Sequence, residues 1–226
     1  MNIFDKEIAK KLIEKGVIKC DSFLTTKEIN IIRSEIEPYI KSISNISNYS
    51  NRILRKTKNV FEISDLGAIS ESAIKYILNE ELAKLVSKYF KENIRVGEFK
   101  YLKQLNASSR NNLYTHCDGN RSVLILIYLT GTSEQTGPTY FFENSHKLRT
   151  KIKKIYIGRN QYESNKQSLN YCVADDMKPG DFVIYDVRTW HGRRPPKIKG
   201  REVIWIEFFP ESNRERCLDM LLKTSS

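Results

Sequence analysis

Three side chains in this sequence are suited to holding a metal ion together. His116 and Asp118 lie two positions apart in the segment Tyr-Thr-His-Cys-Asp-Gly. His191 follows 73 residues after Asp118 and is expected at the end of a strand over 181–187, which in a barrel can lie beside the first pair. Alternate side chains of a β-strand share one face, so His116 and Asp118 are expected to point the same way. The chain has 3 histidines, and two of them occupy these positions. A His-x-Asp pair by itself has a plain alternative, because any strand can carry one as structural residues.

Two imidazoles and one carboxylate are the ligand set typical of non-haem iron(II). Three protein ligands on one face of an octahedral ion leave the remaining positions open for substrate and oxygen. We therefore predict an oxygen-activating iron site, in which His116, Asp118 and His191 are both the metal ligands and the catalytic residues.

Periodic apolar residues predict that the first part of the chain, residues 1–93, is mostly helical. Gly16 stands where the first helix would end, and Thr25 and Glu28 have the capping-box spacing that starts the second. A short strand is expected over Val17–Phe23. The predicted helices cover residues 5–15, 25 to about 42, 66–78 and 80–91.

Short apolar runs separated by turn residues predict strands from about residue 94 onward. Helices followed by strands, without alternation, argue against a parallel doubly wound sheet and for an antiparallel barrel or sandwich flanked by helices. Residues 146–177 fit neither pattern and are expected to form an insertion or lid. The predicted strands cover residues 98–105, 121–130, 139–142, 181–187 and 202–209.

The composition indicates one globular unit. A length of 226 residues with 40% hydrophobic content suits a single domain over residues 1–226, with the strand core over 94–210. The early charges at the N-terminus do not fit a secretory signal, and the longest apolar run, Val123–Leu129, is too short to span a bilayer. We expect a cytoplasmic protein without membrane contact. The 4 cysteines show no Cys-x-x-Cys pair and are expected to be free thiols.

Lys and Arg exceed Asp and Glu by 38 to 27, a net charge of +11. Such a surplus favours acidic partners, either an anionic small molecule or a nucleic acid, although a solvated basic surface would look the same. A basic rim around the metal residues is one form this could take. It would comprise Arg188, Arg193, Arg194, Lys147, Arg149, Lys151, Lys153, Lys154 and Arg159.

With these motifs, the chain resembles the Fe(II)/2-oxoglutarate-dependent dioxygenases, in particular the prolyl-hydroxylase-like and phytanoyl-CoA-dioxygenase-like branches. The resemblance covers residues 94–210 and, more weakly, 16–40. It implies a mainly β fold, the double-stranded β-helix or cupin-like jelly roll, with the N-terminal helices packed on one sheet. The matching pieces, in order, are the His-x-Asp of 116–118, Tyr-Leu-Thr at 128–130, residues 136–142, Pro-Gly-Asp-Phe at 179–182, and His191 followed by Arg201.

The resemblance also implies Fe(II), O2 and 2-oxoglutarate as cofactors and co-substrates. Arg201 would pair with the distal carboxylate of 2-oxoglutarate through its guanidinium fork. Tyr128 would donate its hydroxyl to the same group, and Tyr101 is a weaker candidate. A surface arginine and a core tyrosine are the alternatives for Arg201 and Tyr128. His146 is expected to be structural or to line the pocket.

One departure concerns Arg193. The phytanoyl-CoA-dioxygenase-like branch often has a serine or threonine there, which helps to bind 2-oxoglutarate. The arginine weakens the assignment to that branch while leaving the superfamily intact.

The activity so implied is hydroxylation of a C–H bond in a small molecule, with release of succinate and CO2. An amino acid, a natural-product intermediate or an acyl conjugate would each fit as substrate. The carboxylate of Asp118 argues against halogenation, because related halogenases have a small residue at this position. The alternatives left open are a peptide or protein hydroxylase, a demethylase of alkylated bases, and a catalytically silent jelly roll that binds a ligand or nucleic acid.

Overall fold

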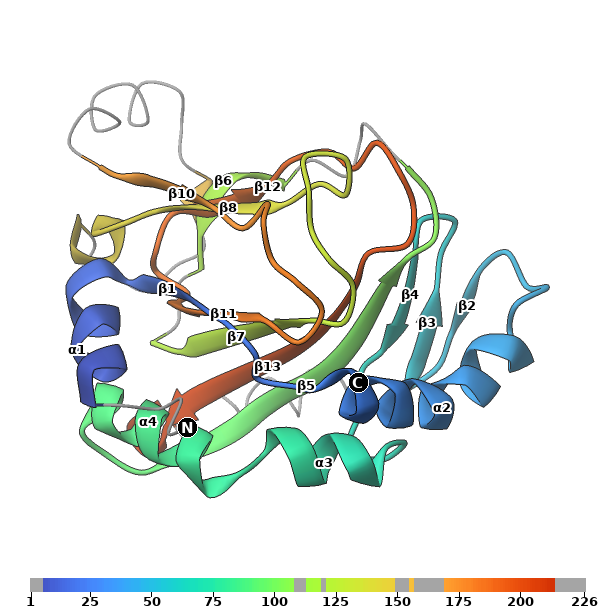
Figure 1. Cartoon of the computed structure of the whole chain (residues 1–226), viewed down its shortest axis with the longest axis horizontal. Helices are drawn as coiled ribbons and strands as arrows, with labels where there is room; N and C mark the ends of the chain where they lie inside the picture. Colours follow the sequence, from blue (N-terminus) through green and yellow to red (C-terminus); the bar gives the residue numbers. More distant parts are fainter. Residues whose placement is uncertain (1–5, 108–112, 119–120, 149–154, 157–168, 214–226) are drawn as a thin grey trace.

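Two antiparallel β-sheets face each other, and helices cover the outer face of the larger one (Figure 1). This computed structural model describes residues 6–107, 113–118, 121–148, 155–156 and 169–213. The 8-stranded sheet has the order β1-β11-β7-β13-β5-β4-β3-β2, and the 5-stranded sheet has the order β10-β8-β12-β6-β9. The predicted fold, a jelly roll with flanking helices, is confirmed.

The predicted strands over 17–23, 98–105, 121–130, 139–142, 181–187 and 202–209 are present with similar bounds, whereas the strands Ile155–Tyr156, Tyr171–Val173 and His191–Arg193 were not predicted. In the larger sheet they are β1 (Val17–Cys20), β5 (Ile94–Gln104), β7 (Val123–Tyr128), β11 (Phe182–Asp186) and β13 (Glu202–Pro210). In the smaller sheet they are β6 (Leu113–Cys117), β8 (Thr139–Phe142), β9 (Ile155–Tyr156), β10 (Tyr171–Val173) and β12 (His191–Arg193).

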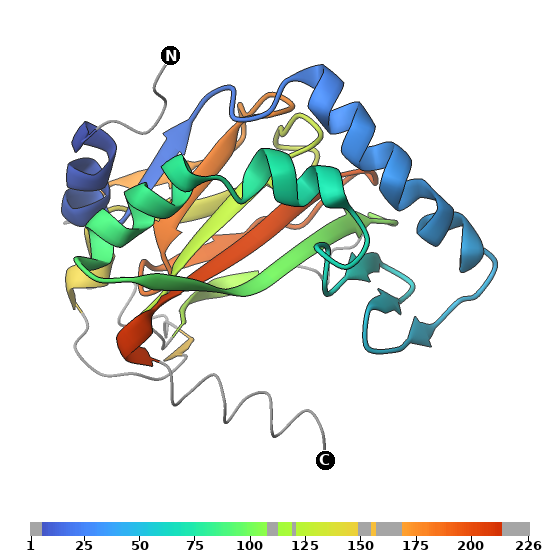
Figure 2. The ribbon, with the colours of Figure 1, turned by 90° about the horizontal axis from the view of Figure 1, so that it is seen from below.

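The helices are α1 (Lys6–Lys15), α2 (Thr26–Ser42), α3 (Glu71–Ile77) and α4 (Glu80–Phe90), and the last three cross the larger sheet (Figure 2). The predicted capping box is present, because Thr25 accepts from the Glu28 N–H and the Glu28 carboxylate accepts from the Thr25 N–H at 2.8 Å. α3 begins later than predicted, since the Ser70 hydroxyl caps its first turn by accepting from the Ala73 N–H at 3.0 Å.

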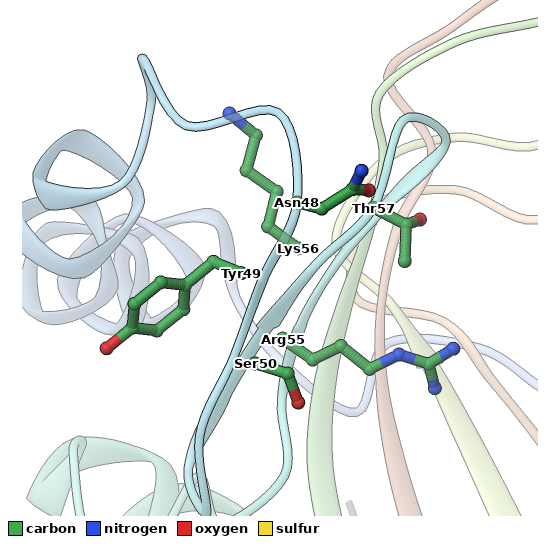
Figure 3. Close-up of a pocket in the computed structure, with 6 residues that line it drawn as sticks. All are labelled: Asn48, Tyr49, Ser50, Arg55, Lys56 and Thr57. Atoms are coloured by element: carbon green, nitrogen blue, oxygen red, sulfur yellow. The ribbon is translucent and has the colours of Figure 1, made fainter.

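The prediction that residues 1–93 are mostly helical was wrong between α2 and α3. Three short strands lie there, namely β2 (Tyr49–Ser50), β3 (Leu54–Lys56) and β4 (Val60–Ile63). They are too short to show a two-residue period, and β4 is stabilised by pairing with β5, where Ile63 lies opposite Tyr101. An open pocket of about 270 Å³ lies at this outer edge of the sheet and is lined by Asn48, Tyr49, Ser50, Arg55, Lys56 and Thr57 (Figure 3).

Strand alternation divides the apolar residues between two cores. On β7, Ile125 and Ile127 join the helices in one core, whereas Leu126 and Tyr128 join a second core between the sheets. Tyr101 belongs to the helix side and is 1% exposed, and burial there raises the pKa of its hydroxyl. The weaker prediction that Tyr101 lies at the site was therefore wrong, because it points away from the space between the sheets.

The predicted insertion over 146–177 falls largely outside the described residues. Its described parts are most of a 3-10 turn, Ser145–Leu148, and the strands β9 and β10, which lie at opposite edges of the smaller sheet. Cys20, Cys117 and Cys172 form no disulfide bond in the described part of the chain, and Cys217 lies outside it. Among the described helices, none has the length and apolar character that crossing a membrane requires.

Candidate metal centre

The metal-binding candidates meet where β6 and β12 run side by side. His116 on β6 lies directly opposite His191 on β12, with their ring centroids 4.3 Å apart. Asp118 follows the end of β6, and its Oδ2 lies 4.0 Å from His116 Nε2 and 3.5 Å from His191 Nε2. One ligand atom from each of the three residues falls within 4.8 Å of the others. The structure therefore brings together the three residues singled out in the sequence.

The element that carries His191 differs from the predicted one. His191 does not end the strand over 181–187; it begins β12 in the opposite sheet, after a tight turn that follows β11. Two hydrogen bonds fix this turn, because the Thr189 N–H donates to the Asp186 carbonyl at 2.8 Å and the Trp190 N–H donates to Ser145 Oγ at 2.7 Å. The change of sheet is what aligns His191 with His116.

The His191 ring is oriented by its own turn. Its Nδ1 lies 2.7 Å from the Thr189 carbonyl oxygen, which can only accept, so Nδ1 carries the proton and Nε2 is left as the metal-binding atom. Phe141 and Tyr185 pack against the ring, with centroid distances of 6.3 and 5.0 Å. His191 is 5% exposed, whereas the Asp118 side chain is 26% exposed, so the centre opens on the aspartate side.

The donor set fits iron(II). It offers two imidazole nitrogens and one carboxylate oxygen, and the described cluster contains no thiolate. Imidazole and carboxylate on one side, with the other side open, form the facial arrangement of non-haem iron oxygenases, whereas a closed tetrahedral set would indicate structural zinc.

Arg201 and Tyr128 lie together between the sheets. Arg201 is 7% exposed, and its guanidinium carbon lies 5.4 Å from the centroid of the Tyr128 ring. Its Nη2 donates to Thr139 Oγ1 at 3.1 Å, while Arg201 Nε and the Tyr128 hydroxyl are buried without a hydrogen-bond partner among the described residues. Buried donors rarely stay unpaired, so this pair fits a bound acceptor such as a carboxylate. The reading of Arg201 as a surface arginine was wrong.

The sequence analysis placed Arg193 in the basic rim and missed that its side chain lies inside this site. It follows His191 by two positions on β12, so both side chains face the space between the sheets. Its Nε donates to the Gly137 carbonyl at 3.0 Å, and its Nη2 donates to Gln104 Oε1. Burial and the nearby Arg201 lower the pKa of Arg193 to about 9, so its guanidinium is still charged at neutral pH. The two-residue spacing from His191 was the available signal.

The inner face of β13 carries a second missed feature. Trp205 and Glu207 keep partial exposure, while the residues beside them on the helix side are buried. Ser122 Oγ donates to Glu207 Oε1 at 2.5 Å. Burial is the largest cause that raises the pKa of Glu207 to about 7, and Glu98 and Asp118 add to the effect. A glutamate within an otherwise apolar strand was the signal in the sequence.

His146 has a structural position, in line with the expectation. It is 6% exposed, its Nε2 donates to the Ile13 carbonyl at 3.1 Å, and burial lowers its pKa. Gly16, with a φ of +80°, lies so close that a Cβ there would be 2.3 Å from His146 Nδ1. His146 therefore joins α1 to the turn after β8 and is not in the metal cluster.

The predicted basic rim is only partly described. Arg188 pairs with Asp186 at 2.5 Å, and Arg194 pairs with Glu134, so these two charges already have acidic partners. The rim residues Arg149, Lys151, Lys153, Lys154 and Arg159 lie outside the described residues.

Comparisons with known proteins agree with this geometry. The sequence profile described as phytanoyl-CoA dioxygenase (PhyH) matches residues 12–196, which is most of the chain. This match corrects the argument against that branch drawn from Arg193. No curated protein matches the sequence.

Solved structures share the fold at low sequence identity. HygX from Streptomyces hygroscopicus, with nickel, 2-oxoglutarate and hygromycin B bound, is 18% identical with a TM-score of 0.65, over 92% of this chain and 88% of its own. The epimerase SnoN, in complex with Fe3+, alpha ketoglutarate and nogalamycin RO, is 13% identical with a TM-score of 0.66, over 91% and 83%. EctD from S. alaskensis, with bound Fe, is 12% identical with a TM-score of 0.71, over 92% and 78%.

The His-Asp-His cluster and these neighbours support the cofactors predicted from the sequence, iron and 2-oxoglutarate. Because the family profile covers more than half of the sequence, the chain belongs to the phytanoyl-CoA dioxygenase family, within the Fe(II)/2-oxoglutarate-dependent oxygenases.

Proposed function

We propose that this protein hydroxylates a C–H bond of a small molecule, with residues 1–226 acting as one oxygenase domain. His116, Asp118 and His191 would hold iron(II), and Arg201 and Tyr128 would hold the distal carboxylate of 2-oxoglutarate. One observation carries the proposal: the three candidate metal ligands converge beside an inter-sheet space that also contains two buried hydrogen-bond donors without a partner among the described residues.

One group of site residues would bind the metal, and another group would bind the co-substrate. The Thr189 carbonyl fixes the His191 ring, so that its Nε2 is presented to the metal. Arg201 offers donors in a fixed fork, and the Tyr128 hydroxyl is buried beside it. When bound, iron(II) would activate O2, the oxidant, with one oxygen atom taken up as 2-oxoglutarate is decarboxylated to succinate and CO2 and the other inserted into the substrate C–H bond. The carboxylate of Asp118 supports hydroxylation over halogenation, because it occupies the third ligand position.

A small polar substrate is supported by the inner face of the larger sheet. Trp205 and Lys100 lie opposite each other on β13 and β5, and both are partly exposed. Glu207 and Glu98 form the next inward-facing pair, and Glu207 is electrostatically coupled to Asp118. Acidic, basic and aromatic groups near the centre suit hydroxyl and amino groups of a small molecule. The ligands named for HygX and SnoN, hygromycin B and nogalamycin RO, are small molecules as well.

The first test is spectroscopic. Anaerobic protein loaded with iron(II) and 2-oxoglutarate should show a weak visible charge-transfer band, and His116→Ala should abolish it. His146→Gln is the matched control, because it alters the histidine outside the cluster and should leave the band in place. An unaltered, iron-loaded protein without the band would contradict the proposal and favour a silent binding protein.

The second test concerns the substrate. Succinate release should be stimulated by a member of a panel of small polar molecules, including amino acids and amino sugars, and not by peptides or nucleic acids. Mass analysis of the product should show the addition of one oxygen atom. Stimulation by peptides alone would refute the small-molecule assignment, and an unchanged product mass would refute hydroxylation.

A further inference from the structure

The inner face of the larger sheet presents three polar groups beside the metal centre, outside the positions assigned to the metal and the co-substrate. They are the Glu207 carboxylate, the Tyr185 hydroxyl and the Trp205 indole N–H. We propose that Glu207 binds a protonated amino group of the primary substrate, while Tyr185 and Trp205 bind neighbouring oxygen atoms of the same molecule. The inference rests on the proposed function and adds the chemical class of its substrate, an amine.

The strand register places these groups side by side. Leu124 on β7 lies opposite both Tyr185 on β11 and Glu207 on β13, so all three share one face of the sheet. Trp205 is two residues from Glu207 and has the same orientation. The Tyr185 ring packs against the His191 ring at 5.0 Å, which puts this row of side chains next to the metal-binding residues.

The Glu207 carboxylate has no cationic partner in the described part of the chain. Ser122 Oγ donates to its Oε1 at 2.5 Å, which leaves Oε2 as an open acceptor. Lys100 faces the same space, but its Nζ lies 2.9 Å from a Glu98 oxygen and 3.9 Å from a Glu62 oxygen. A largely buried carboxylate without a cation is unfavourable, and an ammonium group would supply the missing charge.

Two donors beside Glu207 give independent evidence for a ligand. The Tyr185 side chain is 1% exposed, and its hydroxyl forms no hydrogen bond with any described residue. Burial is the largest cause that raises the pKa of Tyr185, and the charges of Asp118 and Glu207 add to it, so the hydroxyl lies near both carboxylates. Trp205 Nε1 is buried, also without a partner among the described residues. Buried donors are rarely left unpaired, so both fit oxygen atoms of a bound molecule.

The local charge distinguishes an amine from other polar substrates. The whole chain carries a net charge of +11, which favours anions, but this face carries Glu207 and Glu98 next to Asp118. An anionic group placed here would be repelled by these carboxylates, and a neutral hydroxyl would leave the Glu207 charge uncompensated. The indole ring of Trp205 adds to the preference, because aromatic faces attract cations.

The experiment measures succinate release with matched pairs of test compounds. Each pair is an amine and the compound in which a hydroxyl replaces its amino group, namely glucosamine with glucose, lysine with hydroxynorleucine, and ethanolamine with ethylene glycol. The unaltered, iron-loaded protein should release succinate faster with the amine of at least one pair than with its counterpart. For that amine, Glu207→Gln should raise the concentration for half-maximal release roughly tenfold to a hundredfold, the range for a lost charge-assisted hydrogen bond.

Three controls separate recognition of the amine from damage to the fold. Glu207→Asp keeps the charge and should require less amine for half-maximal release than Glu207→Gln. The glutamine variant should keep the charge-transfer band with iron(II) and 2-oxoglutarate, because Glu207 is assigned to neither. Glu80→Gln removes a carboxylate that pairs with Lys84 at 2.7 Å on α4, on the outer side of the larger sheet, and should leave the half-maximal concentration unchanged.

The inference would be overturned if the hydroxyl compounds stimulated release as well as the amines, or if no pair stimulated it. Equal effects of Glu207→Gln and Glu80→Gln, or of Glu207→Gln and Glu207→Asp, would overturn it too. In each case an intact charge-transfer band would leave the proposed function standing. If the unaltered, iron-loaded protein lacked the band, the proposed function and this inference would fall together.

Discussion

Glu207→Gln tests the electrostatics of the space beside the metal centre. Glu207 lies on the inner face of β13 and accepts a hydrogen bond from Ser122 Oγ at 2.5 Å. Burial, the largest cause, acts together with Glu98 and Asp118 to raise its pKa from the ordinary 4.5 to about 7, while the Ser122 hydrogen bond and Lys100 oppose the rise. Glutamine has nearly the same shape, can accept the same hydrogen bond and carries no charge.

The size and sign of the effect follow from linkage. A pKa raised from 4.5 to about 7 corresponds to about 3 kcal/mol. Between these two values the folded protein binds more protons than the unfolded chain, so stability falls as the pH rises through this window. The loss is complete above about pH 7 and absent below about pH 4.5. The glutamine variant does not undergo this loss. The difference in free energy of unfolding between the variant and the unaltered protein should therefore shift in favour of the variant by up to about 3 kcal/mol between pH 4.5 and pH 8.

Thermal unfolding of metal-free protein between pH 4.5 and pH 8 measures this directly. The variant should gain roughly 6 to 12 °C in Tm on the unaltered protein across the range. Glu35→Gln is the control, because the pKa of Glu35 is shifted in the opposite direction to that of Glu207. Burial raises the Glu35 pKa, but hydrogen bonds from Ser70 and Ser72 outweigh this and lower it. Its stabilising contribution is present above the unfolded pKa and lost as the pH falls. Parallel pH curves for Glu207→Gln and the unaltered protein would refute the reasoning.

Two further changes test the elements that position the site. Gly16→Ala should destabilise the protein, because the φ of Gly16 is +80° and the new Cβ would lie 2.3 Å from His146 Nδ1. The control is Gly200→Ala, because Gly200 also has a positive φ (+103°) but its added Cβ would meet no atom within 4 Å. In urea unfolding, Gly16→Ala should lower the free energy of unfolding by more than about 1 kcal/mol beyond the loss in Gly200→Ala. Equal losses would show that the contact with His146 does not matter. Asp186→Asn should cost about 3 kcal/mol, because it leaves the half-buried Arg188 without its carboxylate. It should also weaken iron(II) binding, since the turn that carries His191 would loosen, and unaltered iron affinity would contradict that role for the turn.

Local signals in the sequence were sufficient for much of the fold. The capping box at Thr25 fixed the start of α2, and the apolar run over Thr139–Phe142 was a strand with the predicted bounds. Both depend on neighbours along the chain, which a sequence displays directly. The strands β2, β3 and β4 were missed, because their stability comes from pairing with β5 and with one another, which local periodicity does not reveal.

The same division holds at the site. By itself, the sequence determined that His116 and Asp118 face one way, because two positions along an extended chain bring side chains to the same face. Only the tertiary structure decided that His191 lies directly opposite His116, since that depends on a turn that carries the chain from one sheet to the other. The tertiary structure likewise decided that Arg193 and Arg201 share the neighbours Thr139 and Gln104, which contact the two arginines from between the sheets. Such contacts join residues far apart in the chain, and no spacing along it encodes them.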